Sequence, residues 1–127
     1  MSIKSIFIRQ IDNFMNELYL IFPQSSDILL LKEKYNLIKS INSKLIIDYI
    51  IYFIYPHKDK IIEEDESFFL EGGGQDELKD TSGLKFRDNI KTLWIREISD
   101  ENKEIILKYF KIFVLLSEKQ LIENEIN

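Results

Sequence analysis

The chain has 127 residues, 45% of them hydrophobic and 31% charged, which suits one domain with a buried core. Its net charge is −5, whereas nucleic-acid and anionic-membrane partners demand clustered Lys and Arg, so the overall charge favours neither. Cysteine is absent, which excludes disulfides, thiolate metal sites and cysteine nucleophiles and fits a reducing compartment. We therefore expect a single intracellular domain over residues 1–127.

Membrane insertion is not expected. The longest apolar stretch, LIIDYIIYFIY at residues 45–55, contains Asp48 and is much shorter than the roughly 20 residues that cross a bilayer. The first 22 residues mix charged with apolar positions, so they lack the continuous apolar centre of a signal peptide.

Two amphipathic helices are predicted for the first third of the chain. The first, over residues 2–22, places apolar side chains on one face at helical spacing: Ile3, Phe7, Ile11, Phe14, Leu18 and Phe22. Pro23 ends it, and Ser25 or Ser26 can cap a second helix over residues 26–41. The apolar stripe of that second helix consists of Ile28, Leu31, Tyr35 and Ile38.

Residues 43–55 are predicted as a third helix, capped by Asn42 or Ser43 and the most buried of all. A buried strand is the competing interpretation, because isoleucine and aromatic residues favour strands. We prefer the helix because the flanking segments are helical and no partner strand is visible. Pro56 disfavours helix at Tyr55, and PHKDKII can then restart as a short helix.

Helices are also predicted over residues 84–98 and 100–122. Phe86, Ile90, Leu93 and Trp94 share a strip of the first of them. Ser99 begins the second as an N-cap, followed by two acids in the first turn, and the tail IENEIN, residues 122–127, is expected to fray. The predicted fold is all-α: a single-domain bundle of about five helices with one acidic, glycine-rich loop near residues 71–83.

The acidic residues are concentrated in one segment. Residues 63–80 hold eight acids against Lys79 alone, a net charge of −7, which leaves +2 for the rest of the chain. Three large apolar side chains interrupt this segment: Phe68, Phe69 and Leu70. We expect at least one Phe to dock between the third and last helices; the alternative is that the three side chains bind a partner. Trp94 is the other candidate, because Trp suits both a core edge and a partner interface.

No catalytic, cofactor-binding or metal-binding residues are predicted, and neither an enzyme nor a small-molecule substrate is expected. The solitary histidine, His57, is interpreted as a solvent-facing turn residue. EGGGQ lacks the Lys and Ser or Thr of a phosphate-binding loop and is interpreted as a linker, with acids following that would repel phosphate. The consecutive acids at 63–66 do not match a calcium loop.

Basic residues on the last two helices offer a second function. They are Lys85, Arg87, Lys91, Arg96, Lys103, Lys108 and Lys111. Acids follow several of them directly, which is typical of a solvated face, although Lys85, Lys91, Lys108 and Lys111 could line one side.

Three stretches carry a resemblance: YPHKDKIIEEDESFFL, IKTLW and SDENKEIILKYFKIFVLLSEK. Together they resemble small uncharacterised proteins of giant DNA viruses (nucleocytoplasmic large DNA viruses). The resemblance implies a helical fold and a viral origin, and it supplies no activity or site residues. We expect a non-enzymatic protein that binds another protein, as a virion component or a modulator of a viral or host complex. The alternative is a nucleic-acid-associated accessory factor.

Overall fold

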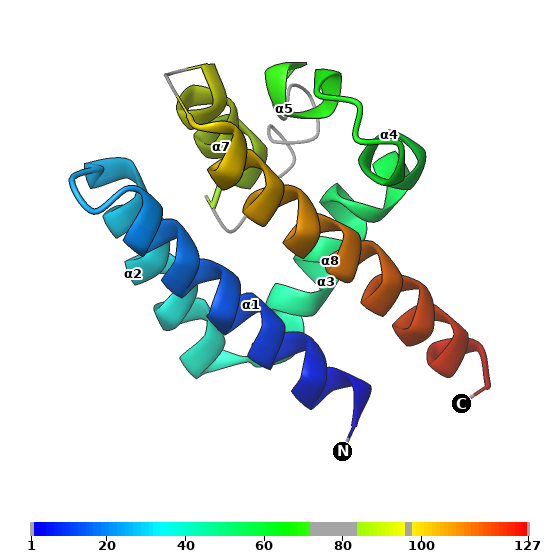
Figure 1. The fold of residues 1–127 in the computed structure, drawn as a ribbon. Helices are drawn as coiled ribbons and strands as arrows, with labels where there is room; N and C mark the ends of the chain where they lie inside the picture. The colour runs from blue at the N-terminus through cyan, green and yellow to red at the C-terminus, as the bar shows by residue number, and fades with distance from the viewer. Residues whose placement is uncertain (1, 72–83, 96–97, 127) are drawn as a thin grey trace.

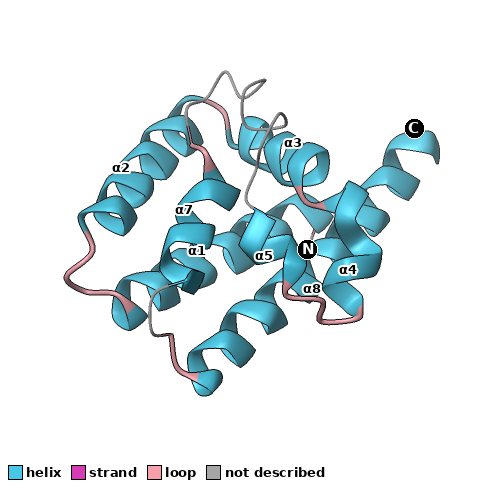
Figure 2. Cartoon of the chain, turned by 90° about the horizontal axis from the view of Figure 1, so that it is seen from above, coloured by secondary structure: helices cyan, strands magenta, loops and turns pink. Residues whose placement is uncertain are grey.

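The computed structural model describes residues 2–71, 84–95 and 98–126, and within these ranges every regular element is a helix (Figures 1 and 2). The all-α prediction is therefore confirmed. The predicted acidic, glycine-rich loop falls almost entirely on residues 72–83, which lie outside the described residues.

The first two helices begin close to where their caps predict. Helix α1 spans Ile3–Ile21, and the side chain of Ser2 accepts a hydrogen bond from the backbone N–H of Ser5 at 3.1 Å. Helix α2 spans Ser26–Ile41, and Ser25, one of the two predicted caps, accepts from the N–H of Ile28 at 3.3 Å.

Residues 45–53 are helical, so the strand alternative is wrong. Helix α3 spans Ser43–Phe53 and is capped by Asn42, followed by a 3-10 turn η1 at Tyr55–His57 and a short helix α4 at Lys58–Ile62. The predicted helix over 43–55 was therefore too long by two residues. Pro56 is the reason, since it disfavours helical backbone at the preceding residue and suits the start of a new turn.

A short helix that the sequence did not predict, α5, covers Ser67–Glu71. Before it, Glu64 adopts a left-handed backbone conformation (φ 57°), so the chain turns sharply after α4. The carboxylate of Asp65 then accepts a hydrogen bond from the N–H of Ser67 at 3.0 Å, which lowers the pKa of Asp65. Asp65 therefore caps the start of the helix that carries Phe68 and Phe69.

The last two helices are α7, Phe86–Ile95, and α8, Asp100–Ile126. Ser99 caps α8 as predicted, accepting from the N–H of Asn102 at 3.1 Å. Helix α8 extends four residues beyond its predicted end at residue 122, and fraying of the tail stays a prediction. Gln120 is buried, and its Nε2 donates to the side-chain Oδ1 of Asn124 at 3.0 Å, which links two successive turns near the end of the helix.

The core lies where α1 packs against α8. Figure 1 shows the two helices running along the same diagonal in opposite directions, with α3 crossing behind them. Phe7 stacks on Phe113 with ring centroids 6.3 Å apart. Two turns further along α1, Phe14 contacts Phe110 with ring centroids 5.6 Å apart. All four rings are fully buried, so aromatic packing between the first and last helices closes the bundle.

Helix α2 is attached to α1 by a polar contact. The Tyr35 hydroxyl donates to Asp12 Oδ1 at 2.5 Å, and Lys39 Nζ donates to the same oxygen at 2.9 Å. Burial of the Tyr35 ring, together with the adjacent carboxylate, raises the pKa of its phenol well above the usual range. The buried face of α2 is thereby fixed against α1, which leaves the opposite face outward.

Candidate functional site

The structure places three of the four sequence-predicted site residues in the core. Phe68 and Phe69 are each 1% exposed and Trp94 is 4% exposed, whereas Leu70 is 46% exposed. Phe69 stacks on Trp94 of α7, with ring centroids 4.2 Å apart, and both phenylalanines contact Phe110 of α8. The rings are packed between α7 and α8, so α7 occupies the place that we expected for the third helix. Of the four candidates, Leu70 alone presents a large apolar surface to solvent.

The four consecutive acids at residues 63–66 lie along α8, and two of them form ion pairs with its lysines. Glu66 meets Lys103 at 2.9 Å and also accepts a hydrogen bond from Trp94 Nε1 at 3.2 Å. Glu64 meets Lys111 at 3.0 Å. The Lys103 ammonium holds the pKa of Glu66 below its ordinary value, with a smaller contribution from the Trp94 N–H. The acids therefore face water, as expected, but they also position the phenylalanines that follow.

Arg87 was interpreted as a surface residue and is instead buried, at 5% exposed. Its Nη2 donates to the backbone carbonyl of Phe68 at 2.9 Å, and its guanidinium lies 4.2 Å from the centre of the Phe68 ring. The sequence did contain a signal for this burial: Arg87 lies at helical spacing from Ile90 and Trp94 and therefore shares their apolar strip.

His57 is half-buried, so its interpretation as a solvent-facing turn residue is wrong. Its ring lies 5.4 Å from that of Phe68, and its Nε2 is 3.3 Å from Arg87 Nη1. A guanidinium only donates hydrogen bonds, so this geometry assigns the acceptor role to Nε2 and the proton to Nδ1. The histidine thus helps to seat Arg87 over Phe68.

The basic residues of the nucleic-acid alternative are in different environments. Arg87 is buried, Lys103 and Lys111 pair with acids, and Arg96 lies outside the described residues. Lys85 and Lys108 are exposed. This distribution does not favour a continuous basic face, and nucleic-acid binding stays a prediction.

An exposed apolar row on α2 is the feature that sequence reasoning missed. Leu30, Leu37 and Ile41 are 51%, 62% and 72% exposed, and we call these three residues the α2 stripe. Their spacing places them on one side of the helix, away from the core residues Ile28 and Leu31. The signal was present in the sequence as a second set of aliphatic residues at intervals of seven and four.

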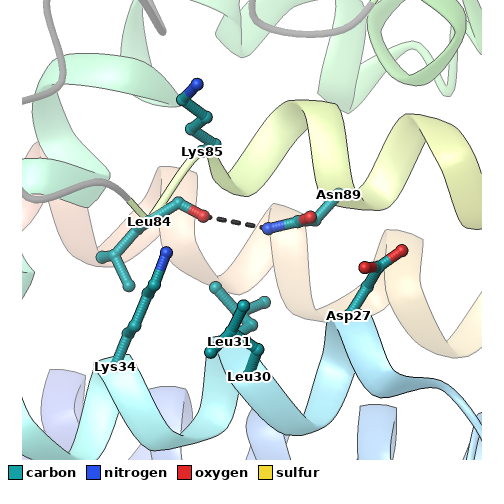
Figure 3. A pocket seen from close by; sticks show the side chains of 7 residues that line it. All are labelled: Asp27, Leu30, Leu31, Lys34, Leu84, Lys85 and Asn89. Atoms are coloured by element: carbon teal, nitrogen blue, oxygen red, sulfur yellow. Dashed lines mark hydrogen bonds between the residues drawn. The ribbon is translucent and has the colours of Figure 1, made fainter.

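A small cavity borders this stripe (Figure 3). Its volume is about 90 Å³, and its lining comes from α2 and from the residues at and before the start of α7: Asp27, Leu30, Leu31, Lys34, Leu84, Lys85 and Asn89. Asn89 closes one wall by donating to the Leu84 carbonyl at 2.9 Å. Small-molecule sites usually have about 300–1,000 Å³. The cavity therefore suits part of one side chain better than a metabolite.

Two larger hollows lie elsewhere on the surface. One, of about 380 Å³, is lined by Lys4, Ser5, Ile8, Arg9, Asp12 and Ser43. The other, of about 360 Å³, is lined mainly by apolar residues around the α1–α2 turn: Ile21, Phe22, Pro23, Gln24, Ser25, Leu93 and Ile98. In the first, Asp12 already accepts hydrogen bonds from Tyr35 and Lys39. The second is formed by the turn between α1 and α2 and by mainly apolar side chains. The Ser5 hydroxyl in the first hollow accepts a hydrogen bond from the Ser2 hydroxyl at 2.9 Å, so both Ser5 and Asp12 have partners within the chain.

Within residues 2–71, 84–95 and 98–126, no three His, Asp or Glu side chains gather as a metal site would require. No helix in the same ranges combines the length and apolar character needed to cross a bilayer.

Comparison with known proteins adds no relative: no family model, curated protein or solved structure matches the chain. The resemblance to proteins of giant DNA viruses therefore stays a prediction.

Proposed function

We propose that the protein is a non-enzymatic helical protein that acts by binding another protein chain through the α2 stripe. The observation that carries this proposal is the exposure of Leu30, Leu37 and Ile41, each more than half exposed on one side of a helix whose other side is core. Single exposed aliphatic residues are ordinary, but a row of them marks a surface that is covered in use.

The geometry of the row supports a helical or groove-shaped partner. Side chains spaced seven and four residues apart are the pattern by which an amphipathic helix engages a groove or another helix. Leu45, in the first turn of α3, is a further half-exposed aliphatic side chain. A role as a virion component or as a modulator of a viral or host complex is the setting that the sequence resemblance suggests.

Site-specific photo-crosslinking tests the proposal. A photoreactive amino acid replaces Leu37 on the α2 stripe or, as a control, the exposed polar Asn16 of α1. In cells that naturally contain the protein, we expect a protein adduct from position 37 that position 16 does not give, and that Leu30→Asp abolishes. Equal labelling from both positions by a folded protein would refute the proposal. Salt-dependent retention on DNA or RNA would instead support the accessory-factor alternative.

A further inference from the structure

A hollow between the N-terminal half of α1 and the start of α3 contains an excess of positive charge. Its volume is about 380 Å³, and we call it the α1–α3 hollow; its lining consists of Lys4, Ser5, Ile8, Arg9, Asp12 and Ser43. This volume lies within the range of about 300–1,000 Å³ that is usual for small-molecule sites. A chain with a net charge of −5 thus has, at this place, two cationic side chains and one acidic side chain around a hollow of ligand size.

Lys4 and Arg9 lie on the two flanks of the hollow. They are five residues apart on α1, about 7.5 Å along the helix axis, and Ile8 and Asp12 lie between them around the helix. Among the residues that the structure describes, neither cation takes part in an ion pair or hydrogen bond. Both side chains are long and exposed, so they can converge on one anion placed over Ile8.

The acid in the hollow does not cancel this charge. Asp12 Oδ1 accepts a hydrogen bond from the Tyr35 hydroxyl at 2.5 Å and another from Lys39 Nζ at 2.9 Å. Lys39 therefore offsets the charge of the carboxylate, and the two cations on α1 remain as a surplus of two positive charges. Like charges around one hollow repel each other, and a bound anion relieves that repulsion.

Neutral donors complete the lining. The Ser5 hydroxyl accepts from the Ser2 hydroxyl at 2.9 Å, so its own proton is left for a further acceptor. Ser43 is the first residue of α3 and lies at the positive end of that helix dipole. An arginine fork, an ammonium and hydroxyl groups are donors that suit the oxygens of a phosphate group, and the arginine can bind two of those oxygens at once.

We propose that the α1–α3 hollow binds a phosphate monoester group. Arg9 and Lys4 contact its oxygens, and the Ser5 and Ser43 hydroxyls donate to it as well. A phosphate monoester carries about −1.5 to −2 charges at pH 7 and so matches the surplus of two positive charges, whereas a carboxylate carries only one. Either a free phosphorylated compound or a phosphorylated serine of another protein can supply this group. The cations are exposed, so the affinity is modest and decreases as the salt concentration rises.

NMR titration of the isotope-labelled protein with O-phosphoserine tests the site. We expect saturable shifts of the backbone amides of Ser5, Arg9 and Ser43, and none with serine, which lacks the phosphate. Arg9→Gln and Lys4→Gln should each weaken binding by about tenfold, as for the loss of one charged hydrogen bond. Both side chains are exposed, so each variant should fold, which circular dichroism verifies.

Lys108→Gln is the matched control, because it removes one exposed positive charge from α8 and should bind O-phosphoserine as the wild type does. Equal weakening by Arg9→Gln and Lys108→Gln would show that only the overall charge attracts the ligand, and it would overturn the proposal. Shifts that do not saturate, or shifts confined to other parts of the chain, would overturn it as well.

A phosphoserine peptide used in the same titration identifies the source of the phosphate group. Tighter binding of the peptide than of O-phosphoserine indicates a phosphorylated protein, and equal or weaker binding indicates a free phosphorylated compound. Both results support the phosphate site, provided that Arg9→Gln weakens the binding and the unphosphorylated peptide does not bind.

Discussion

Phe69 and Trp94 lie face to face, with ring centroids 4.2 Å apart and planes only 10° from parallel. The contact joins residues from two helices that are separated by the segment 72–83. Because Trp94 also donates its Nε1–H to Glu66, the same side chain holds both the apolar and the acidic part of residues 63–71.

The first prediction concerns the two phenylalanines. Phe69→Ala should lower the free energy of unfolding by about 3–5 kcal/mol, as expected for removing a fully buried ring. The Phe68→Ala, Phe69→Ala double variant should lose more than the single variant but less than twice as much, since the rings touch each other. Urea unfolding measures both. Leu70→Ala is the control and should change stability little, because that side chain is half exposed.

Unchanged stability in the double variant, combined with loss of protein association, would contradict the anchoring role. It would favour the alternative in which these side chains bind a partner.

The second prediction concerns pH. The pKa of Glu66 in the folded protein lies below its ordinary value of 4.5, so its contact with Lys103 stabilises the fold above that pH and is lost as the pH falls through the folded pKa. Glu66→Gln should therefore lower the Tm at neutral pH, and the difference from wild type should shrink in acid.

High salt should also reduce the effect of Glu66→Gln, because the ion pair is partly exposed. Glu101→Gln, at an exposed position in the first turn of α8, is a suitable comparison. A difference between Glu66→Gln and wild type that is constant from neutral pH to pH 3 would show that the ion pair is not its source.

The third prediction concerns Arg87. Arg87→Lys should destabilise the protein by about 1–3 kcal/mol, because an ammonium cannot both lie flat on the Phe68 ring and donate to the Phe68 carbonyl and His57. Lys108→Arg on the exposed face of α8 should be close to neutral. His57→Ala should also lose stability, by about 1 kcal/mol, because its Nε2 no longer accepts from Arg87. Chemical denaturation that finds Arg87→Lys as stable as wild type would contradict this account.

The fourth prediction concerns alkaline pH. Burial and the Asp12 carboxylate raise the pKa of Tyr35 above its ordinary value of 10.0. The neutral phenol thus stabilises the fold below pH 10, and this contribution decreases as the pH rises above it. Unfolding between pH 10 and 12 should be less steep with pH in Tyr35→Phe than in wild type.

Absorbance of tyrosinate reports the same group directly. In the native wild type, Tyr35 and Tyr109 should resist ionisation relative to the unfolded chain, because burial raises the pKa of both phenols. If Tyr35→Phe leaves the number of resistant tyrosines unchanged, Tyr35 is not one of the protected groups.

Local signals in the sequence determined the helices and most of their starts. Ser25, Asn42 and Ser99 cap the helices that they were expected to cap, because a cap needs only an oxygen and the N–H two or three residues ahead. The 3.6-residue period of apolar side chains likewise placed Phe7, Phe14 and Leu18 in the core, since burying one face is a property of each helix separately.

Only the tertiary structure decided which elements meet. The seating of Phe68 under Arg87 and of Phe69 against Trp94 joins residues 19 and 25 positions apart, and nothing in local spacing selects α7 over α3 as their support. Burial of Arg87 depends on the Phe68 carbonyl and on His57, which come from two other elements. The sequence likewise did not determine which aliphatic face of α2 is buried, because both faces carry similar side chains. In the folded protein α1 covers one face and leaves Leu37 and Ile41 exposed to water.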